Sequence, residues 1–194
     1  MLNIAVFASG RGSNFEALHR AIADQKIPAR IVVVISNNSS SGVLALAQSL
    51  NIPAFHISQQ QFSDPSLLHN KILKTLQSFN VNFIVLAGYM KKMDSAITRA
   101  FPDRIINIHP ALLPKYGGEG MFGMNVHNAV IAAKEKESGA TVHFVNEEYD
   151  KGVIIGQRKI RIEASDTPET LAAKVLKVEH ELLPSIIKMF SEKI

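Results

Sequence analysis

The chain has 194 residues, of which 46% are hydrophobic and 20% charged, a composition typical of one globular domain spanning residues 1–194. It contains no cysteine, which excludes disulfides, thiolate nucleophiles and cysteine metal sites. Its net charge of +4 is scattered along the chain without a basic stripe, so we expect small anionic substrates and no nucleic acid. No segment reaches about 18 apolar residues, so we expect no membrane association and a cytoplasmic location.

Strands and helices are expected to alternate over residues 1–110. Short apolar runs predict strands at residues 3–8, 30–36, 53–57, 82–88 and 104–108. Apolar residues at helical spacing predict helices at residues 15–22, 43–50, 66–79 and 94–101. Near-continuous apolar strands separated by helices are typical of an α/β fold with a doubly wound, mostly parallel sheet and right-handed crossovers.

The character of the sequence changes after Pro114, where residues 115–124 include four glycines and are expected to form a flexible loop. The elements expected beyond it are a helix at 126–134, strands at 139–145 and 153–162 around a turn at 146–152, and a last helix that starts within 166–169. The Asp-Thr-Pro-Glu sequence of that start is typical of a helix N-terminus. We therefore predict a C-terminal hairpin-type addition to the sheet and a closing helix.

A glycine loop, Ser9-Gly-Arg-Gly-Ser-Asn14, lies between the first expected strand and helix. Backbone N–H groups at a helix N-terminus favour an anion, so we interpret Gly12, Ser13 and Asn14 as a phosphate site. Phe15 stands where a dinucleotide fingerprint has a further glycine, which favours a lone phosphate over NAD. If Gly12 lets the backbone approach the anion, Gly12→Val should weaken phosphate binding and spare the fold. The alternative is a tight glycine turn without a ligand.

Asn107 and His109 stand at the end of the strand predicted at 104–108, just before Pro110. Two residues apart on an extended backbone, their side chains leave the same face, roughly 6–7 Å apart along the strand. Pro110 has no N–H and ends the ladder, which fixes the imidazole at the strand's exit, where α/β sheets bind ligands. The alternative is a polar pair that merely closes a turn.

His143 lies in the strand predicted at 139–145, and Asp150 lies in the turn after it. If that strand pairs with the Asn107 strand, Asp150 should lie near His109 and raise the pKa of its imidazole, which keeps it protonated near neutral pH. The alternative is a core histidine and a turn-forming aspartate. A metal site using His109, His127, His143 and Asp150 is disfavoured, because none of these histidines forms a helical His-x-x-x-His pair.

Four motifs in register make the chain resemble the phosphoribosylglycinamide formyltransferases, a family of the formyltetrahydrofolate-using superfamily. They are Ser9-Gly-x-Gly-Ser-Asn14, Leu86-Ala-Gly-Tyr-Met90, Asn107-x-His-Pro-x-Leu-Leu-Pro114, and Gly139-x-Thr-Val-His-Phe-Val145 continuing through Asp150 and Gly152. The resemblance implies a Rossmann-like formyltransferase fold over residues 1–194. It also implies transfer of a formyl group from 10-formyltetrahydrofolate, as co-substrate, to the amine of glycinamide ribonucleotide in de novo purine biosynthesis.

The resemblance also implies roles for individual residues. Gly12, Ser13 and Asn14 would bind the substrate phosphate, and Glu179 the substrate amine and ribose. Asn107 would hold the formyl oxygen, His109 would act as general acid, Asp150 would keep His109 protonated, and His143 would support them. The implied folate-binding residues are Met90, Lys91, Lys92, Met93, Asn107, Asn146, Glu147, Glu148, Tyr149 and Asp150. The implied partners are these small molecules alone, without a metal, in a monomer or homodimer.

Two segments depart from the family pattern. Residues 117–124 are longer than the usual proline-glycine turn, and residues 61–65 lack the arginine often offered to the substrate phosphate. Two alternatives remain open: a formyltransferase acting on a nucleotide-linked sugar amine, and a non-catalytic phosphometabolite-binding protein of the same fold.

Overall fold

Seven strands form one sheet, in the order β3-β2-β1-β4-β5-β6-β7, in the computed structural model, which describes residues 1–24 and 27–192. The strands are β1 (Leu2–Phe7), β2 (Ala29–Ser36), β3 (Ala54–His56), β4 (Phe83–Leu86), β5 (Ile105–His109), β6 (Glu137–Phe144) and β7 (Ile154–Arg161). The first five pair in parallel, and β6 and β7 are antiparallel additions. The predicted α/β fold and its C-terminal hairpin are therefore confirmed.

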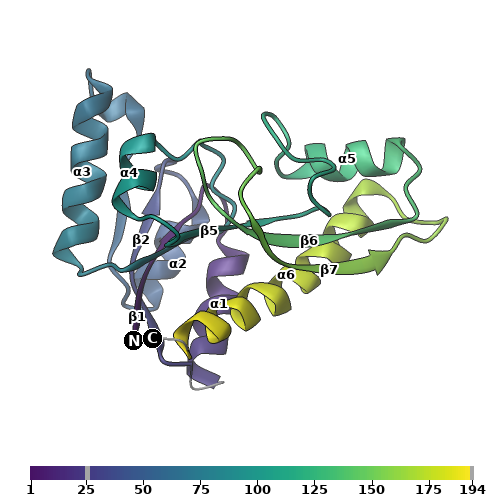
Figure 1. Cartoon of the computed structure of the whole chain (residues 1–194), viewed down its shortest axis with the longest axis horizontal. Helices are drawn as coiled ribbons and strands as arrows, with labels where there is room; N and C mark the ends of the chain where they lie inside the picture. The colour runs from purple at the N-terminus through teal and green to yellow at the C-terminus, as the bar shows by residue number, and fades with distance from the viewer. Residues whose placement is uncertain (25–26, 193–194) are drawn as a thin grey trace.

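Helices cover both faces of this sheet (Figure 1). They are α1 (Ser13–Asp24), α2 (Gly42–Ser49), α3 (Pro65–Ser78), α4 (Ser95–Ala100), α5 (Met124–Ala132) and α6 (Pro168–Ser191), with a short 3₁₀ helix η1 (Gln59–Gln61). Buried residues of α1, α2, α5 and α6 belong to the cluster on one face, and those of α3 and α4 to the cluster on the other. The sequence patterns did not predict η1. The other helices and strands start and end within about two residues of the predicted positions, for the bounds that fall on described residues.

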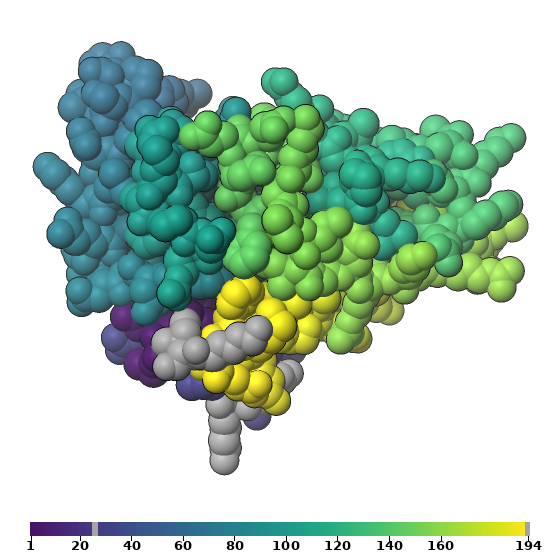
Figure 2. Space-filling model, viewed as in Figure 1, coloured from purple at the N-terminus to yellow at the C-terminus, as the bar shows by residue number. Residues whose placement is uncertain are grey.

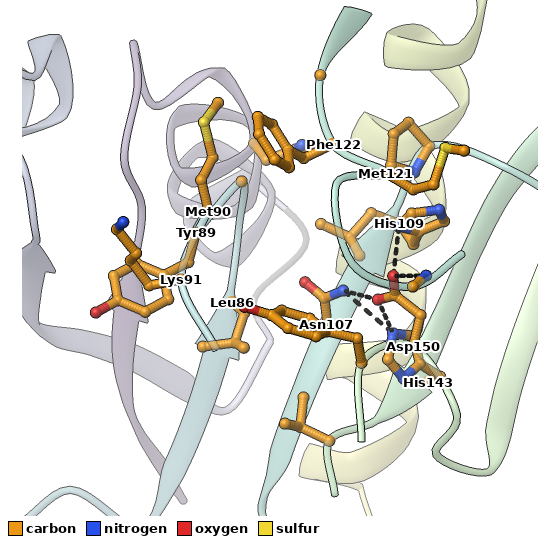
Figure 3. A pocket seen from close by; sticks show the side chains of 18 of the residues that line it. Leu86, Tyr89, Met90, Lys91, Asn107, His109, Met121, Phe122, His143 and Asp150 are labelled. Carbon is orange, nitrogen blue, oxygen red and sulfur yellow. Dashed lines mark hydrogen bonds and ion pairs between the residues drawn. The ribbon is translucent and has the colours of Figure 1, made fainter. Parts of the chain in front are cut away.

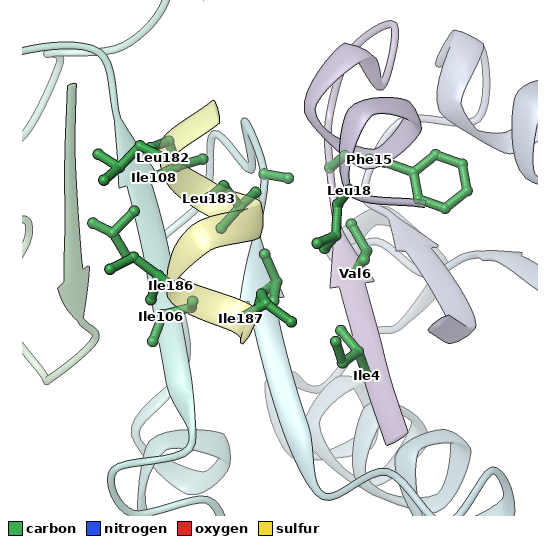
Figure 4. Close-up of a cluster of buried hydrophobic side chains, with 14 of the residues drawn as sticks. Ile4, Val6, Phe15, Leu18, Ile106, Ile108, Leu182, Leu183, Ile186 and Ile187 are labelled. Carbon is green, nitrogen blue, oxygen red and sulfur yellow. The ribbon is translucent and has the colours of Figure 1, made fainter. Parts of the chain in front are cut away.

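The closing helix α6 begins at Thr167, whose side chain accepts a hydrogen bond from the backbone N–H of Thr170. Proline at its first position suits a helix start, where an N–H is not needed. Leu182, Leu183, Ile186 and Ile187 recur at helical spacing and belong to the same buried cluster as the β5 residues (Figure 4). The predicted role of this helix in closing the core is confirmed.

Strand β1 contributes alternate residues to the two cores. Ile4 and Val6 belong to the cluster under α1 and α6, whereas Ala5 and Phe7 belong to the cluster under α3 and α4. Since both faces are covered, the strand shows a continuous apolar run and no alternation of apolar and polar residues.

The sheet order reverses between β1 and β4, and the loops after these two strands therefore diverge. In open α/β sheets a ligand crevice forms outside the carboxyl ends of the strands at such a point. Next to it, β5 and β6 pair with Asn107 opposite His143 and His109 opposite Thr141. The fold thus places the glycine loop, the segment after β4 and the polar end of β5 along the carboxyl edge of the sheet.

The loop between β6 and β7 packs against the α4 region, as the space-filling view shows (Figure 2). Arg99 on α4 pairs with Glu147 in this loop, with 3.4 Å between Nη1 and Oε1. This contact joins the hairpin to the parallel core beside the site. Among the described residues, no helix is both long and apolar enough to cross a membrane.

Candidate active site

A cleft of about 620 Å³ opens at the carboxyl edge of the sheet. Its walls come from the loops after β1, β4 and β5, the β6–β7 loop and one side of α6. The predicted site residues that line it are Ser13, Asn14, Met90, Lys91, Lys92, Met93, Asn107, His109, His143, Asn146, Glu148, Tyr149, Asp150 and Glu179. Gly12 and Glu147 are not among the lining residues.

The carboxylate of Asp150 lies between two histidines and an asparagine (Figure 3). Its Oδ2 is 3.6 Å from His109 Nδ1 and accepts a 2.9 Å hydrogen bond from the backbone N–H of Gly118. Its Oδ1 is 3.4 Å from both His143 Nε2 and Asn107 Nδ2. The expected proximity of Asp150 to His109 is therefore confirmed.

Burial decides the protonation of His109, which is only 4% exposed. Burial lowers the pKa of His109 below its ordinary value, and this effect outweighs the negative charge of Asp150 and the Tyr116 carbonyl, which both raise it. A charge on His143 lowers the pKa of His109 further. The expectation of a raised pKa is therefore wrong, because the cost of burying the imidazolium is the larger effect.

Asp150 keeps its charge despite its own burial. Burial raises the pKa of its carboxyl, but the hydrogen bond with His143, the charge of His109 and the Gly118 N–H together hold the pKa below its ordinary value. The site thus contains an ionised carboxylate whose neighbours are two imidazoles and an amide.

The glycine-rich segment after β5 covers the free end of His109. Its Nε2 donates a 2.8 Å hydrogen bond to the carbonyl of Tyr116, a residue in the left-handed region with φ +57°. The Tyr116 hydroxyl in turn donates to Glu135 Oε1 at 2.9 Å, and Lys115 Nζ donates to the same oxygen. The ring nitrogen of His109 that does not face Asp150 is therefore hydrogen-bonded to this segment.

The glycine loop reaches the cleft at the N-terminus of α1, but Gly12 itself allows α2 to pack closely against this loop. It has φ +87°, and a Cβ atom there would lie 2.6 Å from Cγ2 of Val43 on α2 and 3.2 Å from its Cα. Only a residue without Cβ allows α2 to pack this closely. The expectation that Gly12→Val spares the fold is therefore contradicted.

We predict that Gly12→Val lowers the free energy of unfolding by at least about 1–3 kcal/mol, the usual cost of overpacking, with backbone strain in addition. Gly10→Ala is the matched control, because no atom lies within 4 Å of a Cβ built at Gly10. Urea unfolding of both variants measures the difference. Equal stability of Gly12→Val and wild type would contradict this packing role.

A hydrogen bond between Asn14 and Glu179 joins the glycine loop to α6. Asn14 Nδ2 donates to Glu179 Oε2 at 3.2 Å, and the buried Asn14 Oδ1 atom has no hydrogen-bond partner among the residues that the structure describes. Burial raises the pKa of Glu179 to about 7, although the Asn14 hydrogen bond lowers it somewhat. A carboxyl that is partly neutral at pH 7 thus lies beside the predicted phosphate site.

This raised pKa predicts a pH-dependent stability. The folded state binds a proton at Glu179 that the unfolded state releases near its ordinary pKa of 4.5, so this contribution is present at low pH and is lost as pH rises toward about 7. Glu179→Gln stays neutral and should lack this loss. Melting temperature measured between pH 4 and pH 8 should fall less in Glu179→Gln than in wild type, while the exposed-site control Glu163→Gln should follow wild type.

The segment after β4 and the β6–β7 loop form the wall that the sequence resemblance assigns to folate. Met90 to Met93 line it, and the backbone N–H of Met90 donates to Ser9 Oγ at 2.8 Å. Lys92 Nζ lies 5.9 Å from the ring centroid of Tyr149. The Glu147 side chain is instead 64% exposed and pairs with Arg99, so the structure does not place Glu147 with the other predicted folate residues.

Some cleft residues were not predicted as site residues. Arg11 lies beside Ser13 in the wall, and Met121 and Phe122 line it from the glycine-rich segment. His127 on α5 also lines it and is buried, and its Nδ1 has no hydrogen-bond partner within the described part of the chain. Arg11 stands inside the glycine motif, so the sequence contained a signal that could have identified it as a site residue. His127 had no such signal, because only the fold brings α5 to the cleft.

Positive charge in the cleft wall comes from Arg11, Lys91 and Lys92. Residues 61–65, where the family arginine is missing, do not line it. Within residues 1–24 and 27–192, no group of three or more histidine and acidic side chains is placed to hold a metal ion.

The sheet order agrees with what comparison with known proteins shows. The chain belongs to the formyl transferase family, whose model, described as Formyl transferase, matches residues 2–187. Its relatives in this family include phosphoribosylglycinamide formyltransferases, which confirms the resemblance seen in the sequence.

Three of these relatives give the extent of the similarity. The Haemophilus influenzae phosphoribosylglycinamide formyltransferase is 40% identical over 192 residues, which are 99% of this chain and 88% of that protein. The chloroplastic enzyme of Arabidopsis thaliana is 41% identical over 98% of this chain, which spans only 65% of that protein's length. The crystal structure of glycinamide ribonucleotide transformylase 1 from Symbiobacterium toebii superposes with a TM-score of 0.92 at 33% identity, covering 100% of this chain and 89% of that one.

Proposed function

We propose that this chain transfers the formyl group of 10-formyltetrahydrofolate to the amine of glycinamide ribonucleotide, with residues 1–194 acting as one formyltransferase domain. The observation that carries the proposal is the convergence of Asn107, His109 and Asp150 in a cleft that also contains the N-terminus of α1. A binding protein for a phosphorylated metabolite has no need of a buried carboxylate held between two imidazoles.

The proposed reaction needs a direct attack of the substrate amine on the formyl carbon. A carbon–nitrogen bond forms to the amine, and the bond to the folate nitrogen breaks. The amine loses one proton, and the folate nitrogen gains one. No covalent enzyme intermediate is required, which agrees with the absence of cysteine.

The residues of the site divide this chemistry among them. Asn107 and protonated His109 stabilise the negative charge that develops on the formyl oxygen. His109 then supplies the proton to the leaving nitrogen, and Asp150 stabilises the imidazolium. Because burial lowers the pKa of His109, the opposing charge of Asp150 is needed to make the acid form accessible.

The substrates are proposed to lie along the cleft from α1 to the β6–β7 loop. The N-terminus of α1, with Ser13 and Asn14, offers N–H groups and a positive dipole end to the phosphate. Arg11 is proposed as the substitute for the missing family arginine, since it lines the cleft beside Ser13. Glu179 then faces the ribose and amine, and the segment from Met90 to Met93 faces the pterin.

The test is a formyl-transfer assay with 10-formyltetrahydrofolate and two acceptors, glycinamide ribonucleotide and a nucleotide-linked sugar amine. We expect turnover with the first and only background with the second. The opposite preference, or stoichiometric binding of both substrates without turnover, would overturn the proposal. Turnover is also expected to survive exhaustive chelation, because the proposed steps use proton transfer and hydrogen-bond donors only.

A further inference from the structure

A serine hydroxyl behind the cleft holds residues 90–93, which form part of the wall that the resemblance assigns to folate. The backbone N–H of Met90 donates a 2.8 Å hydrogen bond to Ser9 Oγ. Residues 87–94 belong to no helix or strand. Among the described residues, the backbone of residues 90–93 makes this one hydrogen bond. Ser9 is buried and does not line the cleft, so the position of this wall depends on a residue outside it.

Ser9 belongs to the glycine loop and is bonded to the segment after β4 at two points. Besides its hydroxyl, its backbone N–H donates to the carbonyl of Gly88 at 3.0 Å. Between these two bonds, the Tyr89 ring packs edge-on against Phe7 of β1, with 5.4 Å between the ring centroids. The start of the folate-side wall is therefore fixed to the end of β1 and to the loop that follows it.

Asn37, the first residue after β2, fixes the direction of the Ser9 hydroxyl. A serine hydroxyl has one hydrogen to donate and two lone pairs that accept. The hydrogen goes to Asn37 Oδ1, 2.5 Å away, which leaves the lone pairs of Ser9 Oγ to accept from Met90. Asn37, like Ser9, is not among the residues that line the cleft. A continuous chain of hydrogen bonds thus runs from the loop after β2, through the glycine loop, to the folate-side wall.

We propose that Ser9 and Asn37 are positioning residues, which set the folate-side wall of the cleft from behind through the backbone N–H of Met90. This inference deepens the proposed function and rests on it for the identity of the ligand. Loss of the hydroxyl leaves the backbone bond between Ser9 and Gly88 in place, so the glycine loop itself should keep its position. Folate binding should therefore weaken, while the nucleotide site and the proton transfer should be preserved.

The first measurement is amide hydrogen exchange by NMR in the protein without substrates. Ser9→Ala removes the acceptor of the Met90 N–H, and Asn37→Leu removes the group that directs the hydroxyl. Both should speed exchange of the Met90 N–H by about tenfold or more. Ser191→Ala is the matched control, because it removes a buried hydroxyl at the other end of the chain, where it donates to the Lys188 carbonyl. Exchange at Met90 that is equal in Ser9→Ala and wild type would overturn the inference.

The second measurement is calorimetric binding of tetrahydrofolate, the folate product of the proposed reaction. We expect Ser9→Ala and Asn37→Leu to bind it about 3–10-fold more weakly, the effect of one hydrogen bond. Asn37→Asp keeps an oxygen acceptor for the hydroxyl and should stay within about twofold of wild type. KM for glycinamide ribonucleotide should change by less than about twofold in all three variants. Equal losses for the two ligands, or unchanged tetrahydrofolate binding in Ser9→Ala, would overturn the inference.

The double mutant Ser9→Ala/Asn37→Leu tests whether the two residues act as one chain of hydrogen bonds. It should bind tetrahydrofolate within about twofold of the weaker single variant, and losses that multiply would overturn the inference. If Ser9→Ala fails to fold, Asn37→Leu, at a half-buried loop position, decides by the same two measurements. Wild-type protein that does not bind tetrahydrofolate would contradict the proposed function, whereas exchange at Met90 would still decide the inference.

Discussion

Replacing His109 by asparagine is expected to reduce kcat by about 10²–10⁴-fold, the usual contribution of a positioned general acid. His109 is one of the two imidazoles beside Asp150. Asparagine in its place keeps a smaller polar side chain but cannot act as the acid. KM for the nucleotide should change little, because the phosphate is expected at the N-terminus of α1. Steady-state kinetics and a melting curve on the same preparation measure both quantities.

His56→Asn is the control for this substitution. It makes the same change in β3, an edge strand that β2, β1 and β4 separate from β5. We expect wild-type turnover from it. If His109→Asn retains kcat within about threefold of wild type while folding normally, His109 is not the acid.

Replacing Asp150 by asparagine is expected to lower kcat at neutral pH by an amount similar to His109→Asn. Asparagine nearly preserves the shape of aspartate and tolerates the left-handed backbone conformation at this position, where φ is +55°. The carboxylate charge is the main influence that raises the pKa of His109 against its burial. Without it, the imidazolium should be much less populated.

The pH dependence of kcat/KM shows in which direction Asp150→Asn shifts the pKa of His109. Activity that requires protonated His109 falls as pH rises through its pKa, and that pKa already lies below its ordinary value of 6.5 in the free protein. The falling limb of kcat/KM should therefore lie below that of an unperturbed histidine, and Asp150→Asn should move it still lower. NMR titration of the His109 ring in both proteins measures the shift directly.

The double mutant His109→Asn/Asp150→Asn shows whether the two residues act as one unit. If Asp150 works through the imidazole, the double mutant should be scarcely slower than the slower single mutant. Strictly multiplicative losses, or an unchanged His109 titration in Asp150→Asn, would mean that Asp150 serves only to fix the loop through Gly118.

The sequence by itself determined the order of the elements, the class of the sheet and the family. The runs of β1 and β4 are apolar without alternation because both faces of the sheet are covered, and this signal is local. Pro110 ends β5 at His109 because it lacks an N–H, which is also a property of the sequence alone. The motifs around Asn14, Met90, His109 and His143 carried the resemblance that the comparisons confirm.

The tertiary structure decided the electrostatics and the orientation of the site. The pKa of His109 depends on how deeply its ring is buried by chain segments distant in sequence, so the sequence revealed the attraction of Asp150 but not the larger cost of burial. Gly12 looked like a position for anion approach, and only the packing of Val43 shows why a side chain does not fit there.

The β5–β6 register sets Asn107 opposite His143, and the amide nitrogen of Asn107 lies 3.1 Å from His143 Nε2. The sequence specified which residues we propose to carry the chemistry, because residue type is local. The fold decided their protonation and orientation, because both depend on the distances between side chains that lie far apart along the chain.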